Sequence, residues 1–126
     1  MGEIHLHLGD LKNARSSVDE ALRLSQKNNE KFVEGTSWIL LGRILARTET
    51  SQIHEAEEYI LQGMKILDGL RVKPSYARGY LALGELYANA GQKEKALENL
   101  RKAETMFQEM GMDYWLTRTR KVLAEL

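Results

Sequence analysis

The stretch from Tyr80 to Phe107 constrains the fold of this chain more than any other. Apolar and small residues recur in its first half at steps of three, one and three: Tyr80, Leu83, Gly84 and Tyr87. In its second half they recur at steps of four, three and four: Ala96, Leu100, Ala103 and Phe107. Both spacings place the residues on one face of a helix. Gly91 lies between the halves and supplies a link without a Cβ, so the stretch predicts a helical hairpin.

The same pattern occurs elsewhere in the chain. The first half is repeated by Trp38, Leu41, Gly42 and Leu45. The second half is repeated by Ala56, Ile60, Gly63 and Leu67, and an earlier copy follows Gly9-Asp10 as Ala14, Val18 and Ala21. The anchoring alanines Ala14, Ala56 and Ala96 are 42 and 40 residues apart. Self-similarity at this period is typical of stacked helical hairpins.

These residues resemble the tetratricopeptide repeat, whose pattern has an aromatic residue, Leu-Gly, Tyr, and then Ala, an apolar residue and Ala. Residues 80–103 match it at nearly every position, whereas 38–63 have Leu45 in place of the Tyr and Gly63 in place of the last Ala. The resemblance implies an all-α fold, an α-solenoid of antiparallel helix hairpins that forms a right-handed superhelix. About seven helices are expected, including a truncated first helix and a C-terminal capping helix.

We expect one domain over residues 1–126, with a partial repeat at 1–29, repeats at 31–70 and 74–110, and a capping helix at 112–126. Gly9-Asp10 is the expected turn after a short helix over 1–8. Asn28-Asn29, Gly69 and Gly111 are placed to end later helices, and Pro74 fits a first helical turn. Residues 109–116 also resemble the closing segment of repeat arrays in bacterial signalling proteins, such as nucleotide cyclases and large ATPase regulators. That resemblance implies a module of a larger regulatory protein.

Composition and motifs exclude several classes of function. Lys and Arg number 18, as do Asp and Glu, so no bulk attraction to nucleic acid or to an anionic membrane is expected. The absence of cysteine excludes disulfide and thiolate chemistry and agrees with a cytoplasmic protein. His5 and His7 are two apart, which on a helix points them to different sides and argues against a metal pair. Without a phosphate loop or a catalytic motif, we predict no enzyme, no cofactor and no metal.

The front helices of such a solenoid line a concave groove in which a partner peptide or helix can lie. The candidate partner-binding residues are Ile39, Arg43, Arg47, Arg78, Leu81, Glu85, Asn89, Arg118 and Lys121. Apolar side chains beside basic ones predict an acidic amphipathic segment as the partner. The alternative for Ile39 and Leu81 is that they pack against neighbouring front helices.

Some tetratricopeptide domains grip a C-terminal carboxylate with Lys and Asn side chains in this groove. Here Ile39 and Leu81 stand where that Lys would be, and Arg43 and Glu85 where the Asn would be. The resemblance therefore argues against a binder of chaperone tails.

Self-association is the alternative function. The incomplete first hairpin leaves an apolar side of the helix from Asp10 uncovered, and such a side can pair with a second copy of the chain. The resulting homodimer would regulate an attached catalytic domain. A nucleic-acid surface would depend on Arg118, Arg120 and Lys121 alone, and the zero net charge argues against it.

Overall fold

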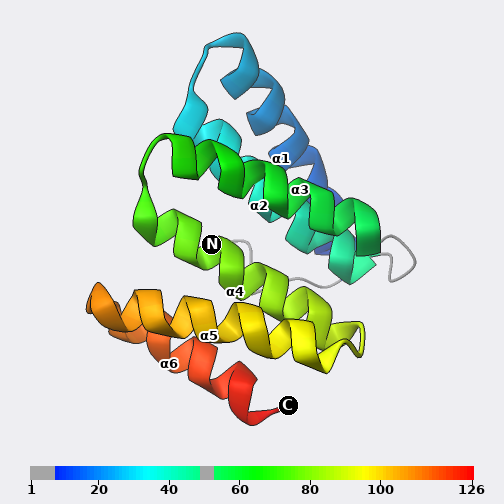
Figure 1. Cartoon of the computed structure of the whole chain (residues 1–126). Coiled ribbons are helices and arrows are strands. Elements are labelled where there is room, and N and C mark those ends of the chain that lie inside the picture. Colours follow the sequence, from blue (N-terminus) through cyan, green and yellow to red (C-terminus); the bar gives the residue numbers. More distant parts are fainter. Residues whose placement is uncertain (1–7, 49–52) are drawn as a thin grey trace.

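A computed structural model describes the backbone of residues 8–48 and 53–126, and the side chains of 11–47 and 53–126. These residues form six α-helices joined by short connections (Figure 1). The helices are α1 (Leu8–Lys27), α2 (Lys31–Thr48), α3 (Ile53–Gly69), α4 (Lys73–Asn89), α5 (Lys93–Glu109) and α6 (Asp113–Ala124). The predicted all-α class is confirmed. The short helix expected over 1–8 lies outside the described residues, except that Leu8 begins α1.

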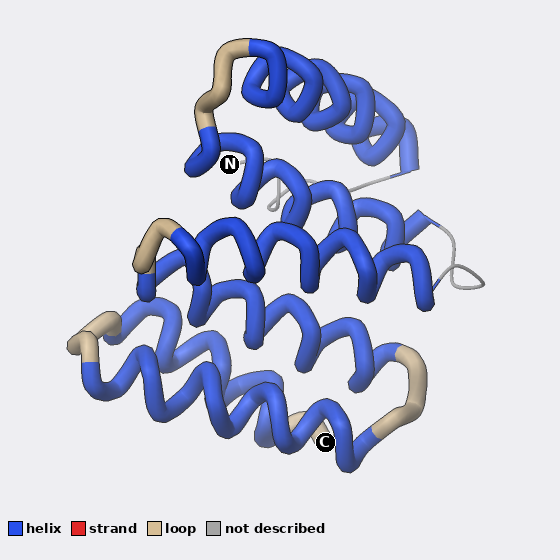
Figure 2. Tube along the Cα trace, turned by 45° about the horizontal axis from the view of Figure 1, so that its top comes forward, coloured by secondary structure: helices blue, strands red, loops and turns tan. Residues whose placement is uncertain are grey.

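Successive helices pack side by side as a stack of antiparallel hairpins (Figure 2). The two tightest pairs are α2 with α3 and α4 with α5, while α1 packs on α2 and α6 closes the stack on α5. The odd-numbered helices α3 and α5 lie toward the viewer in Figure 1 and do not contact each other. The even-numbered helices α2, α4 and α6 contact one another in order on the opposite face. This arrangement confirms the predicted helical repeat solenoid.

Glycines allow the paired helices to approach closely at the positions that the repeat pattern indicates. A Cβ atom added to Gly42 of α2 would lie 2.7 Å from the backbone oxygen of Ala56 in α3. A Cβ atom at Gly84 of α4 would lie 2.5 Å from Cγ of Leu100 in α5. Since real Cβ atoms essentially never come so near another atom, each hairpin crossing depends on its glycine.

Two groups of buried side chains hold the stack together. The larger joins α2 to α6, and its fully buried members include Leu45, Ile60, Leu67, Leu100 and Phe107. The smaller joins α1 to α2 through Leu11, Val18, Leu22, Leu41 and Ile44. Each fully buried aliphatic or aromatic side chain stabilises the fold by about 1.5–3 kcal/mol. Trp38 packs on the smaller group with its ring 5.2 Å from the ring of Tyr59, which agrees with the core position expected for it.

All four tight turns between the described helices share one geometry. In each, one residue adopts a left-handed backbone conformation with φ between 57° and 77°: Asn29, Arg71, Gly91 and Gly111. The amide of the next residue then donates to the carbonyl five residues earlier, at 2.8 to 3.0 Å in every turn. This arrangement is the Schellman motif, which satisfies carbonyl groups at the end of a helix. The predicted helix ends at Asn29 and Gly111 and the turn at Gly91 are therefore confirmed.

The predicted helix end at Gly69 is confirmed, because Gly69 is the last residue of α3. The left-handed residue of the turn that follows is Arg71, and this turn packs Val72 on the core and bonds its amide to Leu67. The turn predicted at Gly9-Asp10 is wrong, because both residues are helical. Both residues lie in the first turn of α1, where a glycine disrupts few helical hydrogen bonds and an aspartate favours the helix dipole.

Candidate peptide-binding groove

The face formed by α2, α4 and α6 carries two adjacent hollows. The first has a volume of about 170 Å³ and is lined by Thr36, Ser37, Ile39, Leu40, Arg43, Ser75, Arg78, Leu81, Ala82, Glu85, Trp115 and Arg118. The second has a volume of about 340 Å³ and is lined by Arg43, Ala46, Arg47, Ile60, Ala82, Glu85, Leu86, Ala88, Asn89, Val122, Glu125 and Leu126. Arg43, Ala82 and Glu85 line both, so the hollows form one continuous groove. On each helix the residues that line only the first hollow precede those that line only the second.

The structure brings eight of the nine predicted groove residues to this surface. Six line the first hollow: Ile39, Arg43, Arg78, Leu81, Glu85 and Arg118. Arg47 and Asn89 line the second hollow, which Arg43 and Glu85 also reach. Lys121 is exposed on α6 and lines neither. The groove therefore extends over three helices, and Lys121 does not line it.

Ile39 and Leu81 contribute to the floor of the first hollow and to the core beneath it. Their exposed fractions are only 8% and 3%, and both belong to the larger buried group. Most of each side chain thus packs against neighbouring helices, as the alternative interpretation expected. The apolar surface within reach of a partner comes from their edges and from Leu40, which is half-buried.

A tryptophan ring organises two arginines of the first hollow. The guanidinium carbon of Arg78 lies 4.2 Å from the ring centre of Trp115, and that of Arg118 lies 5.5 Å from it. Cations over a tryptophan face are attracted by the ring quadrupole. The ring itself packs on the buried Phe107, with ring centres 6.3 Å apart. The two guanidinium groups are therefore positioned by an aromatic platform that the core supports.

One carboxylate faces these arginines. Arg118 forms an ion pair with Glu85 at 3.6 Å across α6 and α4, and about a quarter of each side chain is exposed. This bond connects two helices that make few other contacts, so it helps to fix the distance across the groove. Because both side chains are partly hydrated, the pair contributes at most about 1 kcal/mol to stability.

Trp115 was not among the groove residues predicted from the sequence. Its ring serves two roles, since it contacts Phe107 on the core side and lines the first hollow. A usable signal was present, because Trp115 precedes Arg118 by three residues and so shares a helix face with it. The hydroxyl-bearing residues Ser37 and Ser75, which also line the hollow, gave no such signal.

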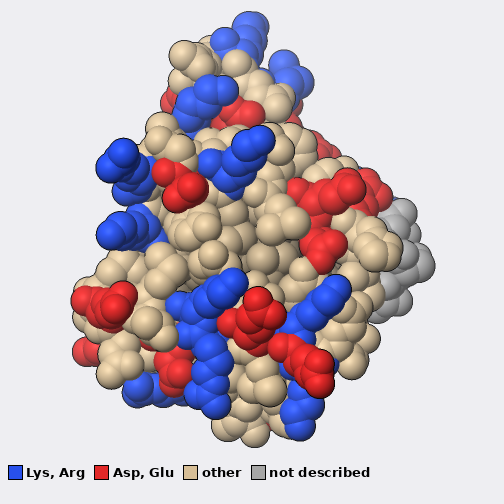
Figure 3. All heavy atoms as spheres, viewed as in Figure 1, with Lys and Arg blue, Asp and Glu red and all other residues tan. Residues whose placement is uncertain are grey.

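The opposite face, formed by α3 and α5, carries charges of both signs. Figure 3 shows Lys and Arg interspersed with Asp and Glu there, around a middle region without charged side chains. Several of these charges pair along one helix, as Glu98 does with Lys102 at 3.6 Å and Arg101 with Glu104 at 3.3 Å. Such exposed pairs are typical of a solvated surface.

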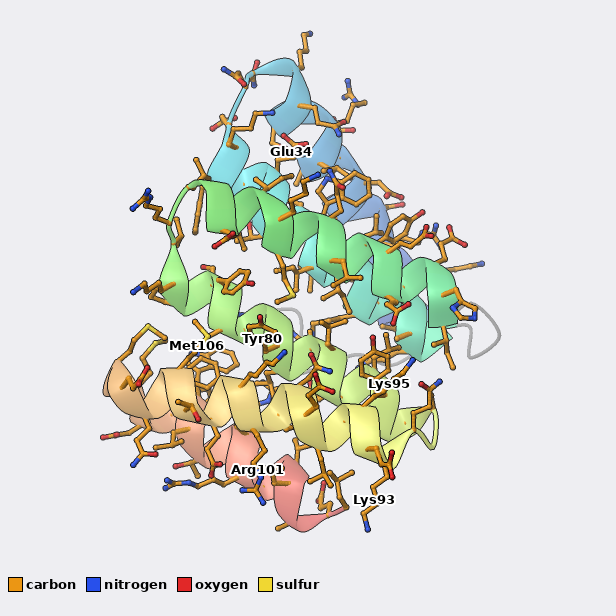
Figure 4. The ribbon with its side chains drawn as sticks, in the orientation of Figure 1. Glu34, Tyr80, Lys93, Lys95, Arg101 and Met106 are labelled. Atoms are coloured by element: carbon orange, nitrogen blue, oxygen red, sulfur yellow. The ribbon has the colours of Figure 1, made fainter. Side chains whose placement is uncertain are left out.

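Tyrosines of α4 line a shallow hollow between α3 and α5 on that face. The Tyr76 and Tyr80 hydroxyls are 3.1 Å apart, and Figure 4 shows Tyr80 on α4 beside α5. The hydrogen bond with Tyr80, together with burial, raises the pKa of Tyr76 to about 12. The Tyr87 hydroxyl donates to a Glu57 carboxylate oxygen of α3, and burial together with this bond raises the pKa of Tyr87. The Tyr76 and Tyr87 hydroxyls therefore stay protonated at neutral pH and have a structural role.

Within residues 11–47 and 53–126, no group of three or more His, Asp or Glu side chains is arranged to hold a metal ion. His54 has a side chain that is 99% exposed, and Ser16 and Ser17 are exposed on α1. His5 and His7 lie outside the described part of the chain. Among the helices α1 to α6, none has the length and hydropathy that crossing a membrane requires.

Stacked hairpins with a groove along one face define a helical repeat scaffold. Comparison with family models makes the class specific, because residues 1–28 and 77–109 match the tetratricopeptide repeat. The chain therefore carries a tetratricopeptide repeat domain, as the sequence pattern predicted. Such repeats are generally modules for protein–protein interaction, a scaffold type rather than a catalytic one. Comparisons with curated proteins and with solved structures gave no match.

Proposed function

We propose that this domain binds a segment of a partner polypeptide in the groove formed by α2, α4 and α6, and acts by binding rather than by catalysis. The continuity of the two hollows across three helices carries the proposal. Apolar floor residues would bury the apolar face of the segment, and arginines on the walls would donate charge-assisted hydrogen bonds to its acidic face. An acidic amphipathic segment is the partner that fits best. We further propose a cytoplasmic setting, in which the domain is one module of a larger regulatory protein.

Two designed peptides test this proposal by fluorescence anisotropy. They share one amphipathic leucine pattern and differ only in carrying Glu or Lys on the polar face. The Glu peptide should bind at least about tenfold more tightly, which corresponds to 1.4 kcal/mol. An Arg43→Glu/Arg47→Glu variant should reverse that preference. The matched control is Arg101→Glu on α5, which also reverses one arginine charge but lies outside the groove.

The circular dichroism of each variant is measured first, so that a loss of fold is not mistaken for a loss of binding. Equal binding of the Glu and Lys peptides would contradict the proposal, as would a groove variant that binds like the wild type. Leu81 is unsuited to such a test, because only 3% of it is exposed and a charged replacement would disrupt the core.

Self-association is the second candidate, and one observation favours it. Three large apolar side chains near the turn between α1 and α2 are exposed: Leu24 (40%), Phe32 (49%) and Val33 (37%). Apolar residues gathered on a surface can mark a contact with another protein chain. If they join two copies, sedimentation velocity should show a dimer whose fraction rises with concentration, and Phe32→Glu should remove it. A monomer over the whole concentration range would eliminate this candidate.

A further inference from the structure

We propose that two copies of this chain associate through the α3–α4 and α5–α6 turns, about a twofold axis that passes between these turns. The inference rests on the self-association candidate above, and it assigns the contact to other turns than the α1–α2 turn. Its evidence is the distribution of exposed apolar side chains, the opposite charges of two neighbouring turns, and the residue type at one strained position.

Exposed apolar side chains gather along one edge of the stack. Among the described residues, six large apolar side chains are exposed, and five of them lie in or near the turns that join α1 to α2, α3 to α4 and α5 to α6. These three turns follow one another along the edge at the left of Figures 1 and 2. The α4–α5 turn at the opposite edge has no such side chain within residues 88–94. The five residues are Leu24, Phe32, Val33, Leu70 and Tyr114.

The middle turn of this edge is positively charged. Within residues 69–77 the only charged side chains are Arg71 and Lys73, which gives a local charge of +2. Both are exposed, and they flank the turn in which Leu70 is 42% exposed. The acidic side chain just before this segment, Asp68, lines the hollow between α3 and α5. The name basic turn is used below for Leu70, Arg71 and Lys73.

The next turn along the edge is negatively charged. Within residues 105–117 the only charged side chains are Glu109 and Asp113, which gives a local charge of −2. Both are exposed, and the adjacent Tyr114 has the largest exposed fraction of the six apolar side chains, 69%. The name acidic turn is used below for Glu109, Asp113 and Tyr114. At the left edge of Figure 3, positive side chains lie beside the α3–α4 turn and negative ones beside the α5–α6 turn.

The charges of these two turns are available to a partner. No ion pair among the described residues involves any charged side chain of the basic turn or the acidic turn. Elsewhere on the surface, charges do pair within the chain, as Glu104 does with Arg101 and with Arg120. Opposite charges on two surfaces that meet steer association and fix its register.

The residue type at position 71 is a second, independent sign that this turn has a role. Arg71 has a left-handed backbone with φ of 60°, whereas the equivalent residues of the other turns are Asn29, Gly91 and Gly111. Glycine and asparagine adopt this conformation at a lower cost than arginine does. Strained residues of this kind cluster at functional sites. What arginine supplies here, and glycine would not, is an exposed positive charge at the tip of the turn.

A twofold axis between the two turns satisfies both charges at once. It places the basic turn of each copy against the acidic turn of the other, so that two equal contacts form together. In each contact Leu70 meets the partner's Tyr114, and the flanking charges have opposite signs. Because the two complementary surfaces lie on one chain, a second copy fits this edge better than an unrelated partner does.

The size of the contact sets the expected strength. Two turns on each side bury less than the roughly 800 Å² per partner of a stable complex, so the dimer is weak and forms at high protein concentration. The turns are already held by hydrogen bonds, from Val72 to Leu67 at 3.0 Å and from Met112 to Phe107 at 2.9 Å, so little order is gained on association. No residue of the basic or acidic turn lines the groove, which therefore stays open to a partner segment.

Sedimentation velocity over a series of protein concentrations at low ionic strength measures the dimer. The dimer fraction of the wild type should rise with concentration. Raising the salt concentration should increase Kd at least about tenfold, because the interacting charges are exposed and screened. Phe32→Glu changes the α1–α2 turn at one end of the same edge and should alter Kd by less than about twofold.

Charge reversal then locates the contact. Arg71→Glu/Lys73→Glu makes both turns negative, and Glu109→Lys/Asp113→Lys makes both positive, so each variant alone should weaken the dimer at least about tenfold. An equimolar mixture of the two variants should dimerise again, since each negative turn then faces a positive one. One chain with all four substitutions exchanges the two signs and should dimerise like the wild type. The matched control is Arg101→Glu, which reverses a charge in the middle of α5.

The circular dichroism of each variant is measured first, so that only folded proteins are compared. A wild type that stays monomeric, a dimer that both double variants leave unchanged, or a mixture that stays monomeric overturns the inference. If Phe32→Glu removes the dimer and the double variants do not, the copies associate through the α1–α2 turn, so the inference fails while the self-association candidate holds. Binding of the Glu peptide is unchanged in the double variants if the groove and the edge act independently, so a failure of the groove proposal is seen separately.

Discussion

Arg71 has a backbone conformation that glycine adopts at lower free energy, so replacing it should stabilise the protein. Its φ is 60°, and the turn is held by hydrogen bonds of 3.0 Å from the Arg71 amide to Asp68 and from the Val72 amide to Leu67. The left-handed conformation is less favourable for a residue with a Cβ by roughly 1–2 kcal/mol. Glycine loses more backbone entropy on folding, an opposing effect of about 0.5–1 kcal/mol. The difference predicts that Arg71→Gly raises the free energy of unfolding by about 0.5–1 kcal/mol.

The measurement is urea denaturation followed by circular dichroism, with thermal unfolding as a second observable. A gain of this size should raise Tm by roughly 2–4 °C for a chain of this length. The control is Arg71→Ala, which also removes the exposed arginine side chain but keeps a Cβ in the left-handed conformation. Comparing the two variants separates the backbone effect from any effect of the lost charge. The denaturant slope must stay constant for the comparison to report stability alone.

The same reasoning predicts a smaller gain at Asn29, because asparagine tolerates the left-handed region better than arginine does. It predicts the opposite sign at Gly91, where a Cβ would introduce the strain that Arg71 already has. If Arg71→Gly proves no more stable than Arg71→Ala, the strain assigned to this turn is absent and the reasoning is refuted.

Three further predictions concern the packing of the hairpins. Gly42→Ala should destabilise the protein by about 1–2 kcal/mol in the same denaturation assay, because the new Cβ meets the backbone of α3. Gly69→Ala should instead stabilise it by up to about 1 kcal/mol, because no atom lies within 4 Å of the new Cβ. Tyr87→Phe should destabilise by about 1 kcal/mol through loss of the bond to Glu57, and a stability equal to that of the wild type would show that the bond contributes nothing. The pKa of Tyr76 is about 12 in the folded protein against an ordinary value of about 10. The stability that this difference contributes is therefore complete below pH 10 and declines as pH rises toward 12. Unfolding free energies measured at pH 9, 10, 11 and 12 should therefore fall less steeply in Tyr76→Phe than in the wild type.

The sequence predicted the hairpins because helix pairing depends on local spacing. Gly84 and Leu100 lie on the faces that a 3.6-residue period assigns to them, and the structure brings them together. The end of α3 at Gly69 was predicted in the same way. The sequence did not indicate which residue of the following turn is left-handed, which is Arg71, with Val72 partly buried against the core. A local pattern carries no information about which side chain the next helix will cover.

Eight of the residues that line the two hollows were assigned from the sequence for a related reason. Positions one step from the core face must border the concave surface once the helices are stacked, so Arg43 and Glu85 could be assigned without coordinates. Trp115 could not, because the same ring contacts the core and the groove, and a spacing pattern assigns each residue to one face only. The bond between Tyr87 and Glu57 was missed as well, since it joins helices whose relative offset the sequence does not specify.

The distribution of charge explains why net charge alone says little about binding by this domain. On α5 and its neighbours, charges of opposite sign pair over short distances, as Glu104 does with Arg101 and with Arg120. Those pairs neutralise the outer surface locally. In the groove the arginines come from different helices, so their proximity depends on the fold rather than on the order of residues in the chain. Stacking three front helices in register therefore brings arginines that are distant in the sequence to one groove, and losing that register would separate them.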